Sequence, residues 1–200
     1  GVYSEKIDFS GKAIIVQSVN GAASTKIQGD NTNNPVVTFN SSETSSAVLK
    51  GFTIDNQYGT ESTLNRGIYI SGAAAPTIRD CIIQGNKLGF DGAGIYINNG
   101  SATIDNTTIG GDSANANTCR YGCGIYATAL SAPLSINNST ISWNSSSGTS
   151  AGGGIYLANT TKTTTISNTK VSNNSTQFGG AIYSTGSPVT INNSAFSNNT

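Results

Sequence analysis

Carboxylates are the side chains of this sequence best suited to acid–base or metal chemistry, because the chain contains no histidine. Several carboxylates around a calcium ion, with an arginine or lysine as base, can support an elimination, and two or three close together can support acid–base hydrolysis. The candidate carboxylates are Asp55, Asp80, Asp91, Asp105 and Asp112.

The best acidic and basic grouping in the sequence is Asp55, Arg79 and Asp105, which we expect to share one outward-facing position of an internal repeat. These three residues could serve such elimination or hydrolysis, but an ion-paired row on the surface is the interpretation that we favour. There is no nucleophile elbow or phosphate loop. We therefore expect no catalysis, no metal site and no cofactor.

Five tyrosines form the most distinctive series. Each follows a Gly-Ile or Ala-Ile pair, and the copies begin 27 or 30 residues apart, at Gly67, Gly94, Gly124, Gly154 and Ala181. Strand alternation would point the isoleucines inward and the tyrosines outward, in a strip along one face. This strip could stack on sugar rings, bury against another chain, or only stiffen the sheet. Its members are Tyr69, Tyr96, Tyr126, Tyr156 and Tyr183.

Self-similarity at this period predicts stacked repeats. No stretch sustains a helical period, so the chain is expected to be all-β. Strands of three to five residues without hairpin signals favour parallel pairing between successive coils, in a right-handed parallel β-helix. We expect variable loops at 59–66, 85–93, 110–123 and 144–153. We expect about seven coils, at 13–34, 35–66, 67–93, 94–123, 124–153, 154–180 and from 181 onward.

A second repeated phrase, such as Thr103-Ile104-Asp105-Asn106, places polar residues at fixed distances from a core isoleucine, with an older copy at Thr53–Asn56. Asparagine tolerates left-handed backbone, and stacked amides can hydrogen-bond to one another. The structural ladder predicted two residues after the isoleucine is Asn56, Asp80, Asn106, Asn138, Asn168 and Asn193. Eight residues after it we expect a second ladder of Asn86, Asp112, Asn144, Asn174 and Asn199. The small residues three after it, which predict an inward slot, are Cys81, Thr107, Ser139, Thr169 and Ser194.

Two cysteines, Cys119 and Cys123, lie four residues apart in the longest insertion before a Gly-Ile-Tyr copy. They could close a small disulfide, which would imply an oxidising location, or remain as a pair of free thiols. A zinc site would need more ligands than this loop provides.

Formal net charge is zero, so nothing suggests nucleic acid or an anionic membrane surface as a partner. No apolar run approaches the ~20 residues of a membrane span. The charges are unevenly placed: residues 1–112 carry ten acidic and seven basic side chains, whereas residues 113–200 carry only three basic ones. The two parts therefore hold opposite charges, which would favour head-to-tail attraction.

The repeats resemble those of right-handed parallel β-helix proteins with a pectin-lyase-like fold. The phrases Gly179-Gly180-Ala181-Ile182 and Phe196-Ser197-Asn198-Asn199 are similar to the GGAI and FxxN repeats of polymorphic outer-membrane and autotransporter passengers. This resemblance implies a single β-helix domain over residues 1–200, and it fits lyases, hydrolases, adhesins and inert rods alike.

Members of that family usually carry caps at both ends, and we expect this chain to lack them. We expect either an excised part of a longer protein or molecules whose ends cover each other in a fibre. The function expected is a non-catalytic structural or adhesive rod, extracellular or at the cell surface. Its partners would be itself, end to end, or carbohydrate. The alternative is a pectin-lyase-like polysaccharide lyase or hydrolase.

Overall fold

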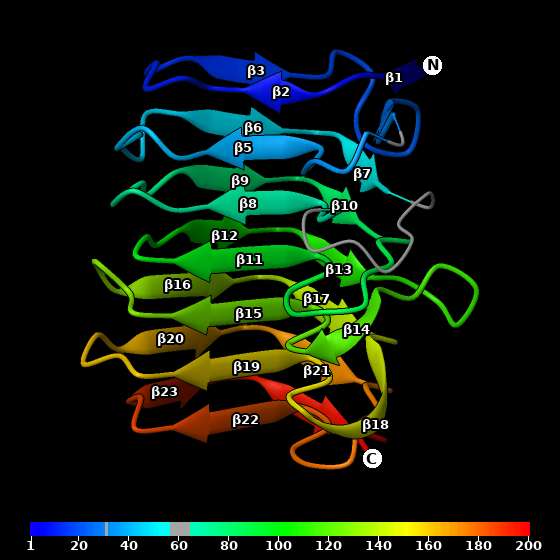
Figure 1. The fold of residues 1–200 in the computed structure, drawn as a ribbon, viewed down its shortest axis with the longest axis vertical. Coiled ribbons are helices and arrows are strands. Elements are labelled where there is room, and N and C mark those ends of the chain that lie inside the picture. Colours follow the sequence, from blue (N-terminus) through cyan, green and yellow to red (C-terminus); the bar gives the residue numbers. More distant parts are fainter. Residues whose placement is uncertain (31, 57–64) are drawn as a thin grey trace.

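The computed structural model describes residues 1–30, 32–56 and 65–200. They form a β-solenoid of about six turns, in which short strands stack along one axis (Figure 1). Every strand pair among these residues is parallel. The predicted all-β parallel solenoid is therefore confirmed. The described residues contain no helix of the length and hydrophobicity that crossing a membrane requires.

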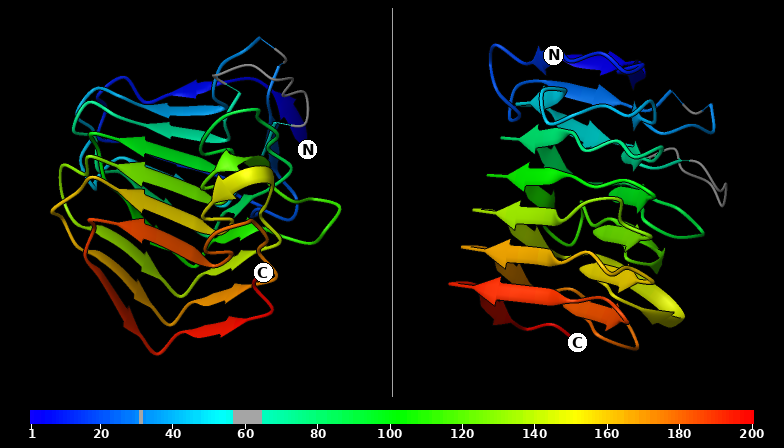
Figure 2. Two further views of the ribbon diagram at one scale, coloured as in Figure 1. Left: turned by 60° about the horizontal axis from the view of Figure 1, so that its bottom comes forward. Right: turned by 90° about the vertical axis from the view of Figure 1, so that its left-hand side faces the viewer.

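Three long sheets form the walls of the solenoid, and each turn contributes one strand to each wall (Figure 2). Sheet 1 has eight strands: β1 (Val2–Ser4), β4 (Lys26–Gln28), β7 (Thr53–Asp55), β10 (Ile82–Ile83), β13 (Thr108–Gly110), β17 (Thr140–Ser142), β21 (Lys170–Ser172) and β24 (Ala195–Ser197). Sheet 2 contains the tyrosine repeats: β2 (Ile7–Asp8), β5 (Val37–Phe39), β8 (Ile68–Ile70), β11 (Ile95–Asn98), β15 (Ile125–Thr128), β19 (Ile155–Ala158) and β22 (Ile182–Thr185). Sheet 3 contains the second repeated phrase: β3 (Ile15–Gln17), β6 (Val48–Lys50), β9 (Thr77–Arg79), β12 (Thr103–Asp105), β16 (Leu134–Asn137), β20 (Thr164–Ser167) and β23 (Val189–Asn192).

A fourth, smaller sheet lies beside the solenoid and is called the side sheet below. It is formed by β14 (Thr118–Tyr121) and β18 (Ser145–Ala151), and single parallel bridges extend it at both sides. Its residues come from loops predicted to be variable, 85–93, 110–123 and 144–153. These loops therefore stack on one another. Of the predicted loop 59–66, residues 59–64 lie outside the described part of the chain.

The core consists of aliphatic rows that run from turn to turn. Period-two burial explains them: in β8 and β11 each isoleucine is fully buried and the tyrosine between them is half-buried. Each fully buried isoleucine contributes about 1.5–3 kcal/mol of hydrophobic stabilisation. The row of sheet 3, for example, is Leu49, Ile78, Ile104, Ile136 and Ile166.

Left-handed residues turn the chain from sheet 3 into sheet 1. The positions after the strands of sheet 3 have φ between 46° and 56°, which asparagine and aspartate tolerate better than other side chains. Two of them are linked directly, because Asn106 Nδ2 donates to Asp80 Oδ1 at 2.7 Å. The left-handed members are Asp80, Asn106, Asn138, Asn168 and Asn193.

Asn56 does not belong to this ladder, so that part of the prediction is wrong. The strand before it, β7, pairs with β10 in sheet 1 and not with β9 in sheet 3. The equivalent of Asp80 in the preceding turn is Gly51, with φ 75°, which follows β6. The phrase at Thr53–Asn56 resembles the sheet 3 repeat in sequence, but its isoleucine aligns with Ile83, the next core layer.

A second asparagine ladder, called the amide ladder below, is buried between sheet 1 and the side sheet. Asn86, Asn117, Asn144 and Asn174 are each fully buried, and each side-chain Nδ2 donates to the Oδ1 of the next at 2.9 Å. The ladder ends at Asn199, which accepts from Asn174 at 2.9 Å. Asp112 is not a member of this ladder, so that part of the prediction is wrong. Asp112 instead holds the turn of the insertion, where its Oδ1 accepts from the backbone of residues 114 and 115.

Four of the five small residues of the predicted inward slot are buried and Ser194 is half-buried, and together they form a hydroxyl ladder. Thr107 Oγ1 accepts from Cys81 N at 3.4 Å, and Ser139 Oγ accepts from Thr107 N at 3.2 Å. The same relation joins Ser139 to Thr169 at 3.3 Å and Thr169 to Ser194 at 3.1 Å. Each of these backbone amides therefore has a side-chain acceptor in the next turn.

Candidate functional site

The structure does not bring the predicted acidic and basic group together. Arg79 and Asp105 are register partners in sheet 3, but Asp55 lies in sheet 1, opposite Gln28. Asp55 is 1% exposed and its Oδ2 lies 2.8 Å from Lys26 Nζ. The expected outward-facing row of three is therefore wrong, because β7 belongs to a different wall from β9 and β12.

The other carboxylates are also dispersed. Asp80 stands at the corner after β9, 4.0 Å from Lys50 Nζ, and Asp105 Oδ1 accepts from Asn138 Nδ2 at 2.8 Å. Asp91 belongs to the side sheet, where it forms a bridge with Tyr121. The part of the chain that the structure describes contains no group of three or more acidic, cysteine or histidine side chains that could hold a metal ion.

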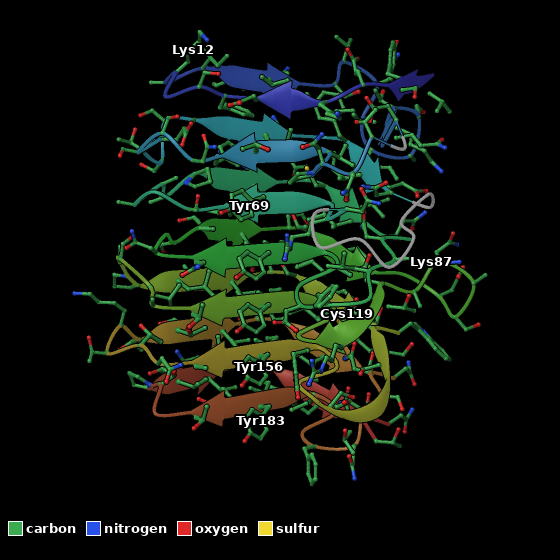
Figure 3. All side chains as sticks on the ribbon, in the orientation of Figure 1. Lys12, Tyr69, Lys87, Cys119, Tyr156 and Tyr183 are labelled. Atoms are coloured by element: carbon green, nitrogen blue, oxygen red, sulfur yellow. A yellow bond between two sulfur atoms is a disulfide. The ribbon has the colours of Figure 1, made fainter. Side chains whose placement is uncertain are left out.

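The five predicted tyrosines are brought together on the outer face of sheet 2. Their strands are in register, so each ring lies above its equivalent in the next turn. The four successive ring-centroid distances are 5.7, 5.1, 5.0 and 5.2 Å, with interplanar angles between 2° and 15°. Figure 3 shows Tyr69, Tyr156 and Tyr183 in one column along the axis. We call this column the tyrosine strip.

Stacking decides what the tyrosine strip can offer to a ligand. The face of each inner ring lies against its neighbour, so the faces are covered and the ring edges and hydroxyls point outward. A sugar that packs on an aromatic face would have to separate two stacked rings. The pKa of Tyr126 is raised to about 12, first because burial disfavours the phenolate and then because Asp91 and the neighbouring tyrosines repel it. Tyr126 therefore stays neutral at physiological pH.

Glycine turns bring the side sheet close against the tyrosine strip. Gly122 (φ 60°) and Gly152 (φ 67°) each stand four residues before a tyrosine. A Cβ at Gly122 would lie 2.6 Å from Ile125 O and 2.8 Å from Tyr126 Cα, so no larger residue fits. Tyr121 of the side sheet packs on Tyr156, with centroids 5.6 Å apart.

A disulfide joins Cys119 and Cys123 in this region. Both cysteines are buried, and they form a small apolar cluster with Leu88 and Ala93. The predicted pairing is thus present. It closes the loop that connects the side sheet to the tyrosine strand β15. The third cysteine, Cys81, is a free thiol in the main core, and burial raises its pKa to about 11.

Arg66 is a site residue that sequence reasoning missed. It is 7% exposed, and its guanidinium carbon lies 4.1 Å from the centre of the Tyr96 ring and 6.0 Å from that of Tyr69. Its Nε donates to the carbonyl of Asp91 at 3.2 Å. Burial lowers the pKa of Arg66 and raises that of Asp91, and each charge counteracts the shift of the other.

The missed signal was an arginine directly before Gly67, where the other copies carry Ala93, Cys123, Gly153 and Gly180. The cation at this position lies over the ring of Tyr96, in the turn after the one that contains Tyr69.

Comparisons of this chain with protein-family models, with curated proteins and with solved structures found no match.

Proposed function

We propose that this chain is a non-catalytic β-solenoid rod with a structural or adhesive role outside the cell or at its surface. The tyrosine strip is the observation that carries this proposal. Its rings stack face to face, with centroids 5.0 to 5.7 Å apart. Stacking of this kind stiffens the solenoid along its axis and does not line a reactive cleft.

Three parallel ladders run along the same axis and support a mechanical role. The stacked rings lie on the outer face of sheet 2, the buried amides lie between sheet 1 and the side sheet, and the hydroxyls occupy the corner between sheets 3 and 1. Unwinding one turn would break contacts of all three kinds with both neighbouring turns. Resistance to local unwinding is what a rod requires.

The disulfide and the resemblance to secreted right-handed β-helix proteins favour the extracellular location. A disulfide between Cys119 and Cys123 is stable where the environment is oxidising. The proposal includes the right-handed coil of that family.

The finer version of the proposal is end-to-end association of copies. Apolar side chains are exposed on outermost strands, with Ile15 at 64% and Phe196 at 40%. Strand edges of this kind pair readily with another chain. The excess of acidic residues in 1–112 and of basic residues in 113–200 would orient the copies head to tail.

Electron microscopy at increasing protein concentration tests this finer version. We expect axial polymers that shorten as salt is added, because salt screens the attraction between unlike ends. Discrete particles of one length at every concentration would refute end-to-end association.

The non-catalytic role is tested separately with acidic polysaccharides, incubated with and without calcium. We expect no eliminative or hydrolytic cleavage. Cleavage that disappears on changing Arg79 or Asp105 to alanine would replace the rod with the lyase or hydrolase alternative.

A further inference from the structure

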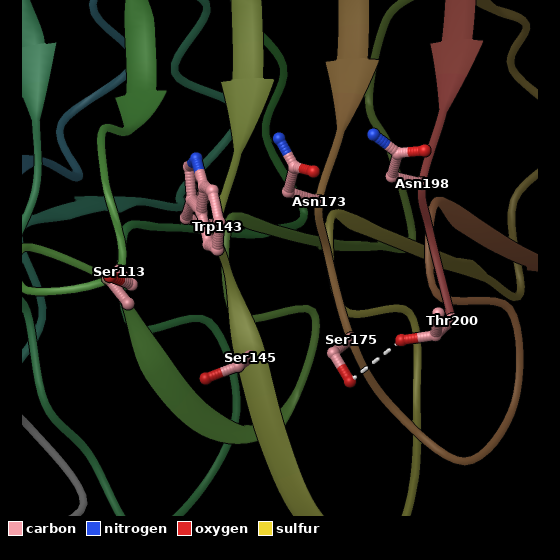
Figure 4. Close-up of a pocket in the computed structure, with 8 residues that line it drawn as sticks. Ser113, Trp143, Ser145, Asn173, Ser175, Asn198 and Thr200 are labelled. Carbon is pink, nitrogen blue, oxygen red and sulfur yellow. Dashed lines mark hydrogen bonds between the residues drawn. The ribbon is translucent and has the colours of Figure 1, made fainter.

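A groove lies at the corner after sheet 1 and contains the single tryptophan of the chain. Its volume is about 270 Å³. The lining residues are uncharged and comprise one tryptophan, one alanine, two asparagines and four hydroxyl residues (Figure 4). They are Ser113, Ala116, Trp143, Ser145, Asn173, Ser175, Asn198 and Thr200.

Trp143 holds an unfavourable backbone conformation to occupy this groove. Its φ is 61°, a left-handed value that is rare for a bulky side chain. The equivalent positions in the next two turns are Asn173 (φ 57°) and Asn198 (φ 54°), which tolerate it. Trp143 is nevertheless 39% exposed, so burial of the indole does not account for the strain. Strain of this kind in a native structure points to a functional role.

The backbone that presents Trp143 is rigid. The next residue, Asn144, is fully buried in the amide ladder and donates to Ile109 O at 3.0 Å and to Asn174 Oδ1 at 2.9 Å. The corner below repeats this arrangement through Asn174. The indole and the two amides therefore stand on a fixed frame, which lowers the entropy cost of binding.

Thr200 Oγ1 donates to Ser175 Oγ at 3.1 Å, whereas three larger polar side chains of the groove have no protein partner. Within the described residues, the indole N–H of Trp143 and the side-chain amides of Asn173 and Asn198 make no hydrogen bond. Figure 4 shows these three side chains side by side, one per turn, above a second row formed by Ser145, Ser175 and Thr200. The rows repeat at the spacing of parallel strands, about 4.8 Å, which is the scale of one sugar ring.

We infer that this groove binds a neutral oligosaccharide that lies along the solenoid axis. The apolar C–H face of a sugar ring packs on an exposed indole, and amides and hydroxyls pair with its hydroxyl groups. The absence of charge among the lining residues selects against acidic glycans and nucleic acids. The inference does not depend on whether the rod polymerises.

The insertion at 112–116 forms one wall of the groove. It supplies Ser113 and Ala116, and Asp112 fixes its turn through hydrogen bonds to Ala114 N and Asn115 N at 2.9 Å. The specificity of the groove therefore lies in a loop that interrupts the repeat, and the repeat supplies the rigid floor.

Trp143 is the only tryptophan of the chain, so its fluorescence reports directly on the groove. The probes are di- to hexasaccharides of neutral glucan, mannan, xylan, galactan and chitin types, with oligogalacturonate as the acidic comparison. We expect a saturable fluorescence change with at least one neutral series and none with the acidic one. No response to any neutral series, or a response to the acidic one alone, would overturn the inference.

Calorimetric titration of variants separates the groove from the rest of the surface. Trp143→Asn introduces the residue type of the next two turns, so it should fold, and we expect affinity to fall about tenfold or more. Asn173→Gly preserves the left-handed turn and should also weaken binding. The matched control is Asn159→Gly, an exposed left-handed asparagine at another corner (φ 53°), which should bind as the wild type does. Equal affinity of wild type and Trp143→Asn would refute the site.

Discussion

Substitution of Asn144 by alanine tests whether the buried amide ladder holds the turns together. The Asn144 side chain is fully buried, donates to Ile109 O and Asn174 Oδ1, and accepts from Asn117 Nδ2 at 2.9 Å. Alanine removes these three bonds and gives the buried partner groups no access to water. The polar groups that lose Asn144 as a partner therefore remain buried without a hydrogen bond.

The expected loss follows from these contacts. Each intramolecular hydrogen bond contributes about 0.5–1.5 kcal/mol net, and a buried polar group left without its partner costs about 1–3 kcal/mol. We therefore expect Asn144→Ala to lower the free energy of unfolding by about 3–4 kcal/mol. For a chain of this size that corresponds to a fall of roughly 10 °C in Tm.

Chemical denaturation followed by circular dichroism measures this loss. The control is Asn192→Ala, an exposed asparagine on β23, where we expect a change within about 0.5 kcal/mol. A loss below about 1 kcal/mol for Asn144→Ala, or equal losses for the two variants, would show that the ladder does not stabilise the solenoid.

Four further predictions concern the tyrosine strip and the cysteines. Tyr126→Ala removes two ring contacts and Tyr183→Ala removes one. We expect the lost stacking to lower the free energy of unfolding by about 2 and 1 kcal/mol respectively, in addition to the effect of lost burial. Denaturation measures both losses, and equal losses would contradict this prediction. Reduction of the Cys119–Cys123 disulfide should lower the free energy of unfolding by about 2 kcal/mol, because the unfolded loop gains entropy. It should also speed amide hydrogen exchange in the side sheet more than in sheet 3. A uniform increase in exchange would argue against a local role of the disulfide. The pKa of Tyr126 is raised to about 12, so the fold favours its protonated form. The stability that this contributes is complete below pH ~10 and is lost as pH rises toward 12. An alkaline unfolding titration should therefore show a steeper loss of stability for the wild type than for Tyr126→Phe. Cys81 should react with thiol reagents only after unfolding, and rapid labelling of the native protein would contradict its burial.

The sequence predicted the features that depend on like residues in like positions. Gly-Ile-Tyr copies at a regular interval were enough to predict parallel stacking, inward isoleucines and an outward tyrosine strip. The left-handed corner at Asn106 and the small slot at Thr107 were predictable for the same reason. In each case one side chain meets its own equivalent in the next turn, so local alternation and the period together fix its surroundings.

Only the tertiary structure decided the features that depend on irregular turns. Thr53–Asn56 resembles the sheet 3 repeat, yet hydrogen bonding and burial of Ile54 place it in sheet 1. Asn117 replaces Asp112 in the amide ladder because the insertion lengthens the connection, which counting from Ile104 could not show. The contact of Arg66 with Tyr96 and the groove beside Trp143 join residues from different turns and loops. The repeat period determines which side chains stack within the regular turns. The contacts of the segments that interrupt the repeat depend on three-dimensional packing.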